Sequence, residues 1–142
     1  MELAVLDASV ALAWVLPDEG LVEPVGRLMR AVARQEMQLA IPSVWPYEVA
    51  HGLRRAALRG RVDRSRAWHF LQTVLEVDVA TYPASDVIQR AWWIAASGGI
   101  TVYDACYLAL AQALDCICLT ADRKLANAAA SSGLVRWIGD YE

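Results

Sequence analysis

Hydrophobic residues along the chain follow two patterns that alternate from one end to the other. Short continuous apolar runs are typical of buried strands in a parallel sheet. Longer segments with apolar residues three and four apart are typical of amphipathic helices. The runs predict strands at residues 2–6, 39–41, 77–80, 116–120 and 134–137. The spaced segments predict helices at residues 9–16, 21–36, 43–58, 63–75, 85–97, 102–114 and 122–131.

Turn and capping residues mark the ends of several of these segments. Pro17 is expected to stop the first helix, and Pro42 closes the second strand, because proline has no N–H to donate. Ser43 is expected to cap the third helix. Thr101 and Asp104 have the spacing of a capping box, with Asp in place of Glu, at the start of the helix over 102–114.

Strands that alternate with helices predict an α/β domain with three layers and a mainly parallel sheet. A chain of 142 residues suits one such domain, which we expect to span residues 1–142. In sheets of this kind ligands collect beyond the carboxyl ends of the strands, where the strand order reverses. Candidate functional residues are therefore expected at that edge.

The composition, with 57% hydrophobic residues, is that of a globular protein with a large core. No apolar run reaches the ~18 residues of a membrane span. The acidic Glu2 stands where a signal peptide would need a basic region. The sequence therefore predicts a cytoplasmic protein without a membrane segment. Cys106, Cys116 and Cys118 lack metal-binding or redox spacing and are expected to be buried, reduced thiols.

Four carboxylates interrupt apolar surroundings near the expected carboxyl edge of the sheet. Asp7 follows the first strand and Asp122 the fourth, while Asp104 and Glu48 lie in the first turns of two helices. Each has a local alternative, because the aspartates can cap helices and Glu48 can pair with Arg55. Caps need neither apolar flanks nor a shared sheet edge, so we expect all four to converge on one cavity.

Carboxylates this close repel one another at low effective dielectric, so they need a cation between them or raised pKa values. Oxygen-only ligands suit Mg²⁺ or Mn²⁺. Zinc would need imidazole or thiolate ligands, which His51 and His69 are not spaced to supply. Acidic sites with hard divalent ions are typical of metal-assisted phosphoryl chemistry. We therefore interpret Asp7 as a metal ligand.

These residues lie in motifs that resemble those of a known family. In chain order the motifs are DASVALAWVLPDE, PSVWPYEVAHGL, ITVYDACYLALA and LTADRKL. Their order and spacing are similar to those of PIN-domain proteins, in particular the VapC-type ribonuclease toxins of prokaryotic toxin–antitoxin pairs. The resemblance spans nearly the whole chain, from residue 3 to about residue 137.

The resemblance implies a flavodoxin-like parallel sheet of about five strands and an acidic catalytic quartet. Asp7 and Asp104 match the family's most direct metal ligands, and Asp122 and Glu48 complete the pocket through direct or water-mediated contacts. The implied activity is Mg²⁺- or Mn²⁺-dependent endonucleolytic cleavage of RNA. The implied partners are a second copy of the chain, as a homodimer, and a cognate antitoxin whose C-terminal segment covers the active-site groove.

Three further positions have counterparts around the family's metal site. Ser9 and Thr120 match hydroxyl positions near the metals. His51 stands where the family usually has Asn, three residues after Glu48. Because residues three apart share a helix face, His51 can still donate a hydrogen bond to Glu48.

Arginines are concentrated between residues 54 and 66, although a net charge of −3 gives the chain no general attraction for nucleic acid. The run is either an ordinary solvated helix face or a phosphate-binding rim beside the acidic pocket. Arg54 and Arg55 are the candidates for phosphate contact, because they follow Glu48 closely. The run consists of Arg54, Arg55, Arg59, Arg61, Arg64 and Arg66.

Two other functions compete with the ribonuclease hypothesis. A phosphatase of the haloacid dehalogenase type would use two aspartates after the first strand, whereas Ser9 occupies the second position here. A non-catalytic RNA- or protein-binding module on the same fold would be expected to have lost some of the four carboxylates. All four are present, so metal-dependent RNA cleavage is the leading hypothesis.

Overall fold

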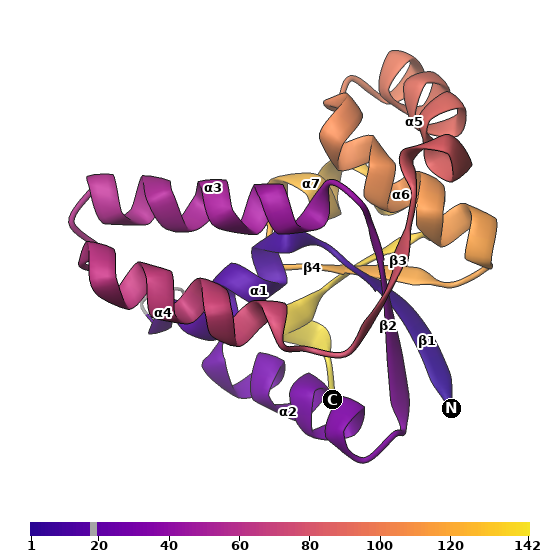
Figure 1. Ribbon diagram of the computed structural model, residues 1–142. Coiled ribbons are helices and arrows are strands. Elements are labelled where there is room, and N and C mark those ends of the chain that lie inside the picture. Colours follow the sequence, from indigo (N-terminus) through magenta and orange to yellow (C-terminus); the bar gives the residue numbers. More distant parts are fainter. Residues whose placement is uncertain (18–19) are drawn as a thin grey trace.

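Strands and helices alternate along the chain in the computed structural model, which describes residues 1–17 and 20–142 (Figure 1). The strands are β1 (Glu2–Leu6), β2 (Met37–Pro42), β3 (Val79–Tyr82), β4 (Ile117–Thr120) and β5 (Val135–Trp137). The helices are α1 (Ala8–Val15), α2 (Val22–Ala33), α3 (Trp45–Leu58), α4 (Arg64–Leu75), α5 (Ala84–Gly98), α6 (Val102–Leu114) and α7 (Arg123–Ala128). Short 3₁₀ turns follow at Ala130–Ser132 and Ile138–Asp140.

The strands form one parallel sheet in the order β3-β2-β1-β4-β5. This confirms the predicted parallel α/β fold. The order differs from the flavodoxin order 2-1-3-4-5, because β1 lies here between β2 and β4. The chain moves outward from β1 to β3 and then returns to β4 on the other side of β1, so the strand order reverses between β1 and β4. Asp7 follows β1, and Thr120 ends β4, at this switch point.

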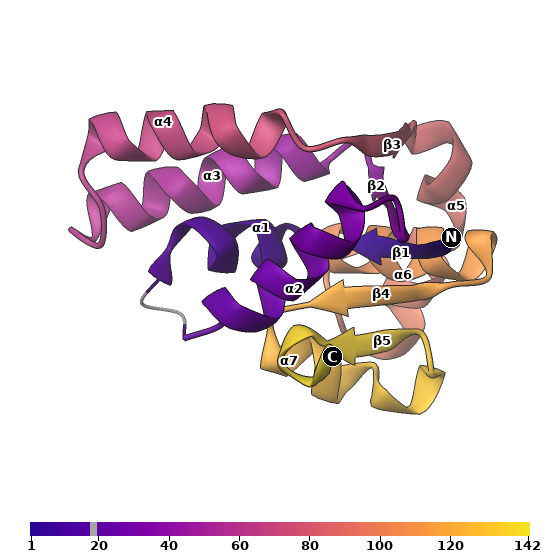
Figure 2. The same ribbon diagram turned by 90° about the horizontal axis from the view of Figure 1, so that it is seen from below.

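Helices cover both faces of the sheet and make a three-layer domain (Figures 1 and 2). Helices α1 to α4 connect β1, β2 and β3 and lie on one side, whereas α5 and α6 lie on the other. Helix α6 packs directly against β1, β2 and β4. The α3–α4 pair packs together as a hairpin that projects beyond the edge of the sheet (Figures 1 and 2).

The core is built from the central strands and the inner faces of the helices. Val5, Leu39 and Leu119 are fully buried on adjacent strands, and Tyr107 of α6 and Trp45 of α3 are among the largest buried side chains. In the described residues, the buried polar side chains are those of Asp7 and Thr120. Burying an isolated carboxylate is unfavourable for folding. The buried Asp7, with Thr120 beside it, therefore indicates a functional position within the core.

Several predicted boundaries of β2, α3 and β3 were wrong. Strand β2 spans Met37–Pro42 rather than residues 39–41, and β3 ends at Tyr82 rather than at residue 80. Ser43 does not cap α3, whose N-cap is Val44, because the Ser43 N–H donates to the Tyr82 carbonyl and continues the pairing of β2 with β3. The third strand begins at Val79 rather than at residue 77, because the Val77 N–H donates to the Val74 carbonyl and still belongs to the turn after α4.

Two helices are shorter than their apolar patterns predict. Helix α2 ends at Ala33 because Gln35 adopts a left-handed conformation with φ of 60°. The helix expected over 122–131 is divided into α7 and a 3₁₀ turn. By contrast, α6 has the predicted bounds, and the Thr101 hydroxyl accepts the predicted capping bond from the Asp104 N–H at 3.0 Å.

Cys106, Cys116 and Cys118 form no disulfide among the described residues; Cys106 and Cys118 are buried as predicted, whereas Cys116 is only partly buried. Within residues 1–17 and 20–142, no single helix is long and apolar enough to cross a membrane. Helices α5 and α6 meet that length and composition criterion only jointly, as a pair bent by 116°.

Candidate functional site

Asp7 is held in a closed hydrogen-bond arrangement at the end of β1. Its side chain is 5% exposed, and its Oδ2 accepts hydrogen bonds from Ser9 Oγ at 2.6 Å and Thr120 Oγ1 at 2.7 Å. The backbone N–H of Asp7 donates to the Leu119 carbonyl and ties this residue to β4. Although Asp7 is at the N-cap position, its side chain makes no capping bond to α1. Helix capping therefore does not explain this carboxylate.

The same hydroxyls connect Asp7 with the segment after β4. Ser9 Oγ accepts a hydrogen bond from the Ala121 N–H at 2.9 Å. Thr120 Oγ1 accepts one from the Asp122 N–H at 3.0 Å. Each hydroxyl thus donates one hydrogen bond to the Asp7 carboxylate and accepts one from a backbone N–H, so both its donor and an acceptor lone pair are used. The result is a rigid link between the ends of β1 and β4.

The other three carboxylates come from three helix starts. Glu48, in the first turn of α3, accepts a 2.7 Å hydrogen bond at Oε1 from the Tyr107 hydroxyl of α6. Asp104 lies half-buried in the first turn of α6. Asp122 caps α7, since its Oδ1 accepts from the N–H groups of Lys124 and Leu125. The capping alternative is thus correct for Asp122, through one of its two carboxylate oxygens.

All four carboxylates line one cavity with a volume of about 560 Å³ at the carboxyl edge of the sheet. This confirms the predicted convergence. Arg55 lines the same cavity, but Arg54 does not: it lies in a separate groove between α3 and α4. The cavity is also lined by Ser9, His51 and Tyr103.

Burial, with a smaller contribution from neighbouring negative charges, raises the pKa values of Asp7, Glu48 and Asp104. Burial raises the pKa of Asp7 from 3.8 to about 6, the hydrogen bonds from Ser9 and Thr120 oppose this rise, and the charges of Asp104 and Glu48 add to it. Burial also raises the pKa of Glu48, where the Tyr107 hydrogen bond works in the opposite direction. The pKa of Asp104 is raised by burial and then by Asp122. Mutual repulsion of this kind is relieved by a bound cation.

A divalent metal fits this cavity by the chemistry of its donors, which are carboxylate oxygens with hydroxyl support. The side chains are not closed around such an ion. In the described part of the chain, no three His, Cys, Asp or Glu side chains are arranged to hold a metal.

Sequence reasoning missed two residues that shape the cavity. Tyr107 was not singled out, although it lies three residues after Asp104 and so near it along α6, which was the available signal. Gly52 lines the cavity in the middle of α3, where a Cβ would overlap the Leu12 side chain of α1. A glycine inside a helix is itself a signal of close packing.

The PIN-domain family model matches residues 4–131, which is most of the chain. The chain belongs to the PIN-domain family. All four carboxylates of the switch-point cavity lie within the matched residues.

Curated relatives of this PIN domain carry ribonuclease names. Ribonuclease VapC9 from Mycobacterium tuberculosis is 37% identical over 123 residues, which cover 87% of this chain and 88% of VapC9. VapC ribonuclease Mb0985 from Mycobacterium bovis matches equally well. Ribonuclease VapC3 from Pyrobaculum aerophilum is 33% identical over 125 residues, covering 87% of this chain and 92% of that protein.

Solved structures share the fold of this PIN domain. PAE2754 from Pyrobaculum aerophilum superposes with a TM-score of 0.67 and 25% identity, covering 97% of this chain and 84% of that one. VapBC2 from Rickettsia felis, solved bound to a DNA fragment from its promoter, gives a TM-score of 0.66 with 11% identity. That match covers 95% of this chain and 98% of the other, and it concerns the fold alone.

Proposed function

We propose that this chain is a single-domain, cytoplasmic, metal-dependent endoribonuclease that serves as the toxin of a type II toxin–antitoxin pair. The observation that carries the proposal is the cavity in which Asp7, Glu48, Asp104 and Asp122 meet. Within the described residues, none of the four forms an ion pair with Lys, Arg or His. Four such groups together are unfavourable for folding, which supports a role in binding a cation and a phosphodiester.

Asp7, Asp104 and Asp122 are the proposed metal ligands, and Glu48 completes the acidic pocket. A bound Mg²⁺ or Mn²⁺ would supply activation of water and neutralisation of the charge that develops on the phosphodiester. Ser9 and Thr120 orient the Asp7 carboxylate through the bonds described above. The Tyr107 hydroxyl does the same for Glu48.

The positive and polar lining residues suit an RNA substrate. Arg55 lies on α3 at the wall of the cavity, where its guanidinium can contact a phosphate with two parallel hydrogen bonds. His51 also lines the cavity on the same helix and is exposed. We assign phosphate contact to Arg55 rather than Arg54, because Arg54 lines a different surface.

The test is cleavage of a mixed RNA pool by the purified chain, free of antitoxin, with and without Mg²⁺ or Mn²⁺. Asp7→Asn is the matched variant, because it keeps the shape of the side chain and removes its charge. Metal-dependent cutting that Asp7→Asn abolishes supports the proposal. No cutting by well-folded protein with either metal would favour the binding-module alternative, and cutting that survives Asp7→Asn would remove Asp7 from the site.

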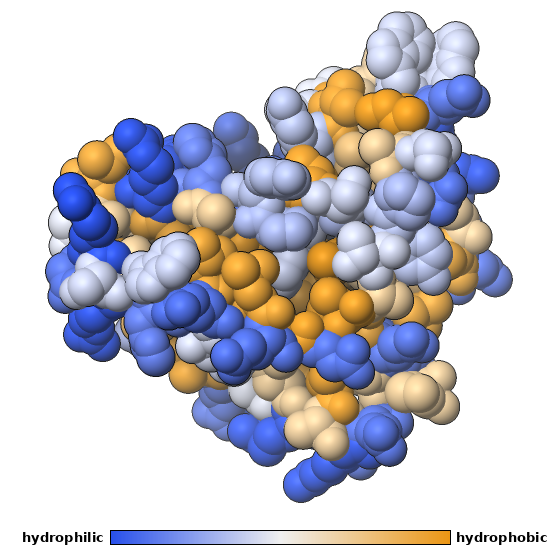
Figure 3. All heavy atoms as spheres, in the orientation of Figure 1, coloured by the Kyte–Doolittle hydropathy of each residue, from blue (hydrophilic) through white to orange (hydrophobic). Residues whose placement is uncertain are grey.

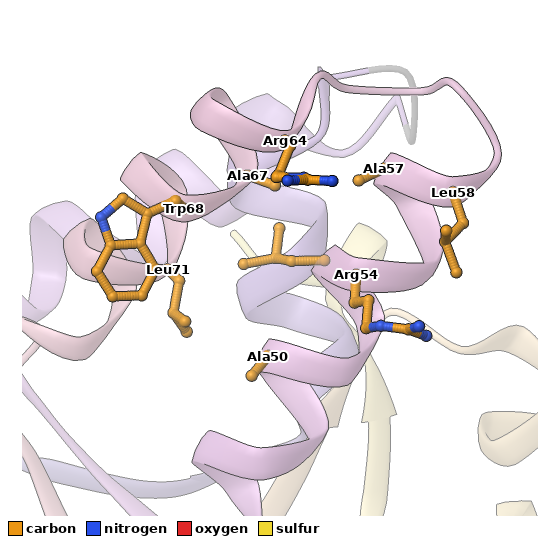
Figure 4. Close-up of a pocket in the computed structure, with 9 residues that line it drawn as sticks. Ala50, Arg54, Ala57, Leu58, Arg64, Ala67, Trp68 and Leu71 are labelled. Carbon is orange, nitrogen blue, oxygen red and sulfur yellow. The ribbon is translucent and has the colours of Figure 1, made fainter.

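A groove between α3 and α4 supports the antitoxin part of the proposal. It has a volume of about 590 Å³, and apart from Arg54 and Arg64 its lining is apolar, with Trp68 62% and Leu58 69% exposed. Figure 3 shows hydrophobic atoms exposed along this seam, and Figure 4 shows its walls, with Trp68 and Leu71 on α4 and Arg54 and Leu58 on α3. Exposed apolar grooves of this kind bind the apolar face of a helix.

The charges of the groove define the antitoxin segment further. Among the described residues, its lining includes two arginines and no acidic side chain, so an amphipathic helix with acidic flanks is complementary. Helix α3 forms a wall of both hollows: Arg54 lines the groove, and Arg55 lines the acidic cavity. A segment bound in the groove can therefore continue across α3 to the carboxylates.

Exposed aromatic residues on α5 support the homodimer part of the proposal. Trp92 and Trp93 are 55% and 68% exposed, with their rings edge to face at 5.0 Å, and Ile88 of the same helix is 43% exposed. Tryptophan is enriched at protein interfaces. Sedimentation of the purified chain, compared with a Trp93→Lys variant, tests this surface: a monomer in both cases would remove it as the interface.

A further inference from the structure

Arg123 stacks over the ring of Trp137, next in sequence to Asp122 of the acidic cavity. The guanidinium carbon is 3.5 Å from the centre of the Trp137 ring. Arg123 is the residue directly after Asp122, and Trp137 is the last residue of β5. No sequence pattern pointed to this pair, because the two residues are separated by the turns that follow α7.

The position of the pair follows from the sheet register. Trp137 is the register partner of Thr120 on β4, and Thr120 donates its hydroxyl to Asp7, which follows β1. Neighbouring strands are about 4.8 Å apart, so Trp137 lies two strands, or about 10 Å, from the strand that carries Asp7. Arg123 is therefore at the same carboxyl edge as the cavity, on the opposite side from Arg55 of α3.

The Trp137 ring is held by packing. A Cβ at position 139 would overlap its six-membered ring, so the glycine there allows the backbone to pack on the indole. The indole N–H is buried without a hydrogen-bond partner among the described residues. The position of the Trp137 ring is therefore set by packing against Gly139 and by stacking with Arg123, and not by a hydrogen bond of its N–H group.

The stacked guanidinium keeps its donors available. Arg123 is exposed and, in residues 1–17 and 20–142, makes no hydrogen bond or ion pair. Stacking on an aromatic ring uses the face of the guanidinium and leaves the N–H groups at its edge free for a phosphate. A cation in the first turn of a helix also contributes unfavourably to stability, so the fold itself gives no reason for the charge.

We infer that Arg123, oriented by Trp137, binds a backbone phosphate of the RNA strand beside the scissile phosphodiester. This inference rests on the proposed ribonuclease function. A strand that places one phosphodiester over the carboxylates passes between Arg55 on one side and Arg123 on the other. The two arginines then set the path of the strand, while the carboxylates do the chemistry between them.

The test measures binding of a fluorescently labelled, single-stranded oligoribonucleotide of random sequence to the Asp7→Asn protein over a range of salt concentrations. Adding Arg123→Ala should weaken binding about tenfold at low salt. It should also reduce the slope of log K against log salt by about 0.7, the value for one lost phosphate contact on a single strand. Arg123→Lys should keep the slope, since the charge remains, but not the full affinity.

Arg136→Ala is the matched control, because Arg136 precedes Trp137 on β5, is exposed and points to the opposite face of the strand. Its slope and affinity should equal those of the parent. An unchanged slope in Arg123→Ala, with or without a lower melting temperature, would show that the pair merely joins α7 to β5 and would overturn the inference. Equal losses in both variants would also overturn it, as a general charge effect.

The two proposals fail in different ways. If wild-type protein cuts RNA and the Asp7→Asn parent binds it with a steep salt dependence that Arg123→Ala leaves intact, the inference alone is wrong. If wild-type protein cuts no RNA and the parent binds none, the ribonuclease function is wrong, and the inference falls with it.

Discussion

The Tyr107 hydroxyl donates a 2.7 Å hydrogen bond to Glu48 Oε1 and so joins α6 to α3 across the acidic cavity. Tyr107 is fully buried, whereas Glu48 is half-buried and lines the cavity. The bond lowers the pKa of Glu48 against the rise caused by burial. A core residue thereby favours the ionised form of a carboxyl group in the proposed catalytic site.

Tyr107→Phe should raise the pKa of Glu48 further, because the ionised carboxylate loses its donor. The acid limb of the pH profile of kcat/KM should then move to higher pH, and the free energy of unfolding should fall by about 1 kcal/mol. Tyr103→Phe is the control, since Tyr103 is 61% exposed at the same cavity. Coincident pH profiles for wild type and Tyr107→Phe would contradict this role.

Asp7→Asn should stabilise the metal-free protein at neutral pH. The pKa of Asp7 is about 6 in the folded state against an ordinary value of 3.8, so the folded state binds more protons between these pH values. Stability must therefore fall as pH rises from 3.8 through 6. The gain in Asp7→Asn should be absent below pH 3.8 and reach at most about 3 kcal/mol above pH 6.

Denaturant unfolding with a chelator present, at several pH values, measures this difference between Asp7→Asn and wild type. The comparison removes the contribution of all other titrating groups common to both proteins. A difference that does not change with pH would mean that Asp7 ionises normally and that its burial has no electrostatic cost.

Thr120→Val should destabilise the protein by about 1–3 kcal/mol and strongly reduce RNA cutting. The variant removes the hydroxyl that donates to Asp7 and leaves the Asp122 N–H without its acceptor, at a position with no exposed surface. Thr73→Val is the matched control, because that hydroxyl is exposed and bonds to the His69 carbonyl. Equal losses of stability in the two variants would argue against a special role for Thr120.

Gly52→Ala should cost about 1–3 kcal/mol of stability and alter the cavity, because the new methyl group overlaps Leu12. Gly26→Ala, also within a helix, meets only the flexible end of Arg30 at 3.3 Å. That control should be neutral or stabilising by up to about 1 kcal/mol, as expected when alanine replaces glycine in a helix. Thermal unfolding of both variants measures the difference in their stabilities. Equal melting temperatures would mean that α1 and α3 move apart to accommodate the new methyl group.

Trp68→Ala should weaken inhibition by the antitoxin while leaving RNA cutting by the free chain intact. Trp68 lines the α3–α4 groove and is not one of the described residues that line the acidic cavity. Leu75→Ala serves for comparison, since Leu75 is 52% exposed on α4 but outside the groove. Inhibition titrations should separate the two variants by tenfold or more, a typical loss for an aromatic anchor. Equal inhibition of both would place the antitoxin elsewhere.

The sequence by itself determined the strand and helix alternation, the bounds of α6 and the meeting of the four carboxylates at one edge. These follow from local rules: the apolar period sets each element, and parallel strands place their carboxyl ends together. The bounds of β3 were misjudged because pairing with β2, rather than the apolar run, decides where that strand begins.

Only the tertiary structure decided which side chains share a surface. The sequence treated Arg54 and Arg55 alike, yet α3 turns one toward the apolar groove and the other toward the carboxylates. The contacts of Tyr107 with Glu48 and of Arg123 with Trp137 likewise join separate elements. Periodicity places a residue on a face of its own element, whereas packing alone determines what that face meets.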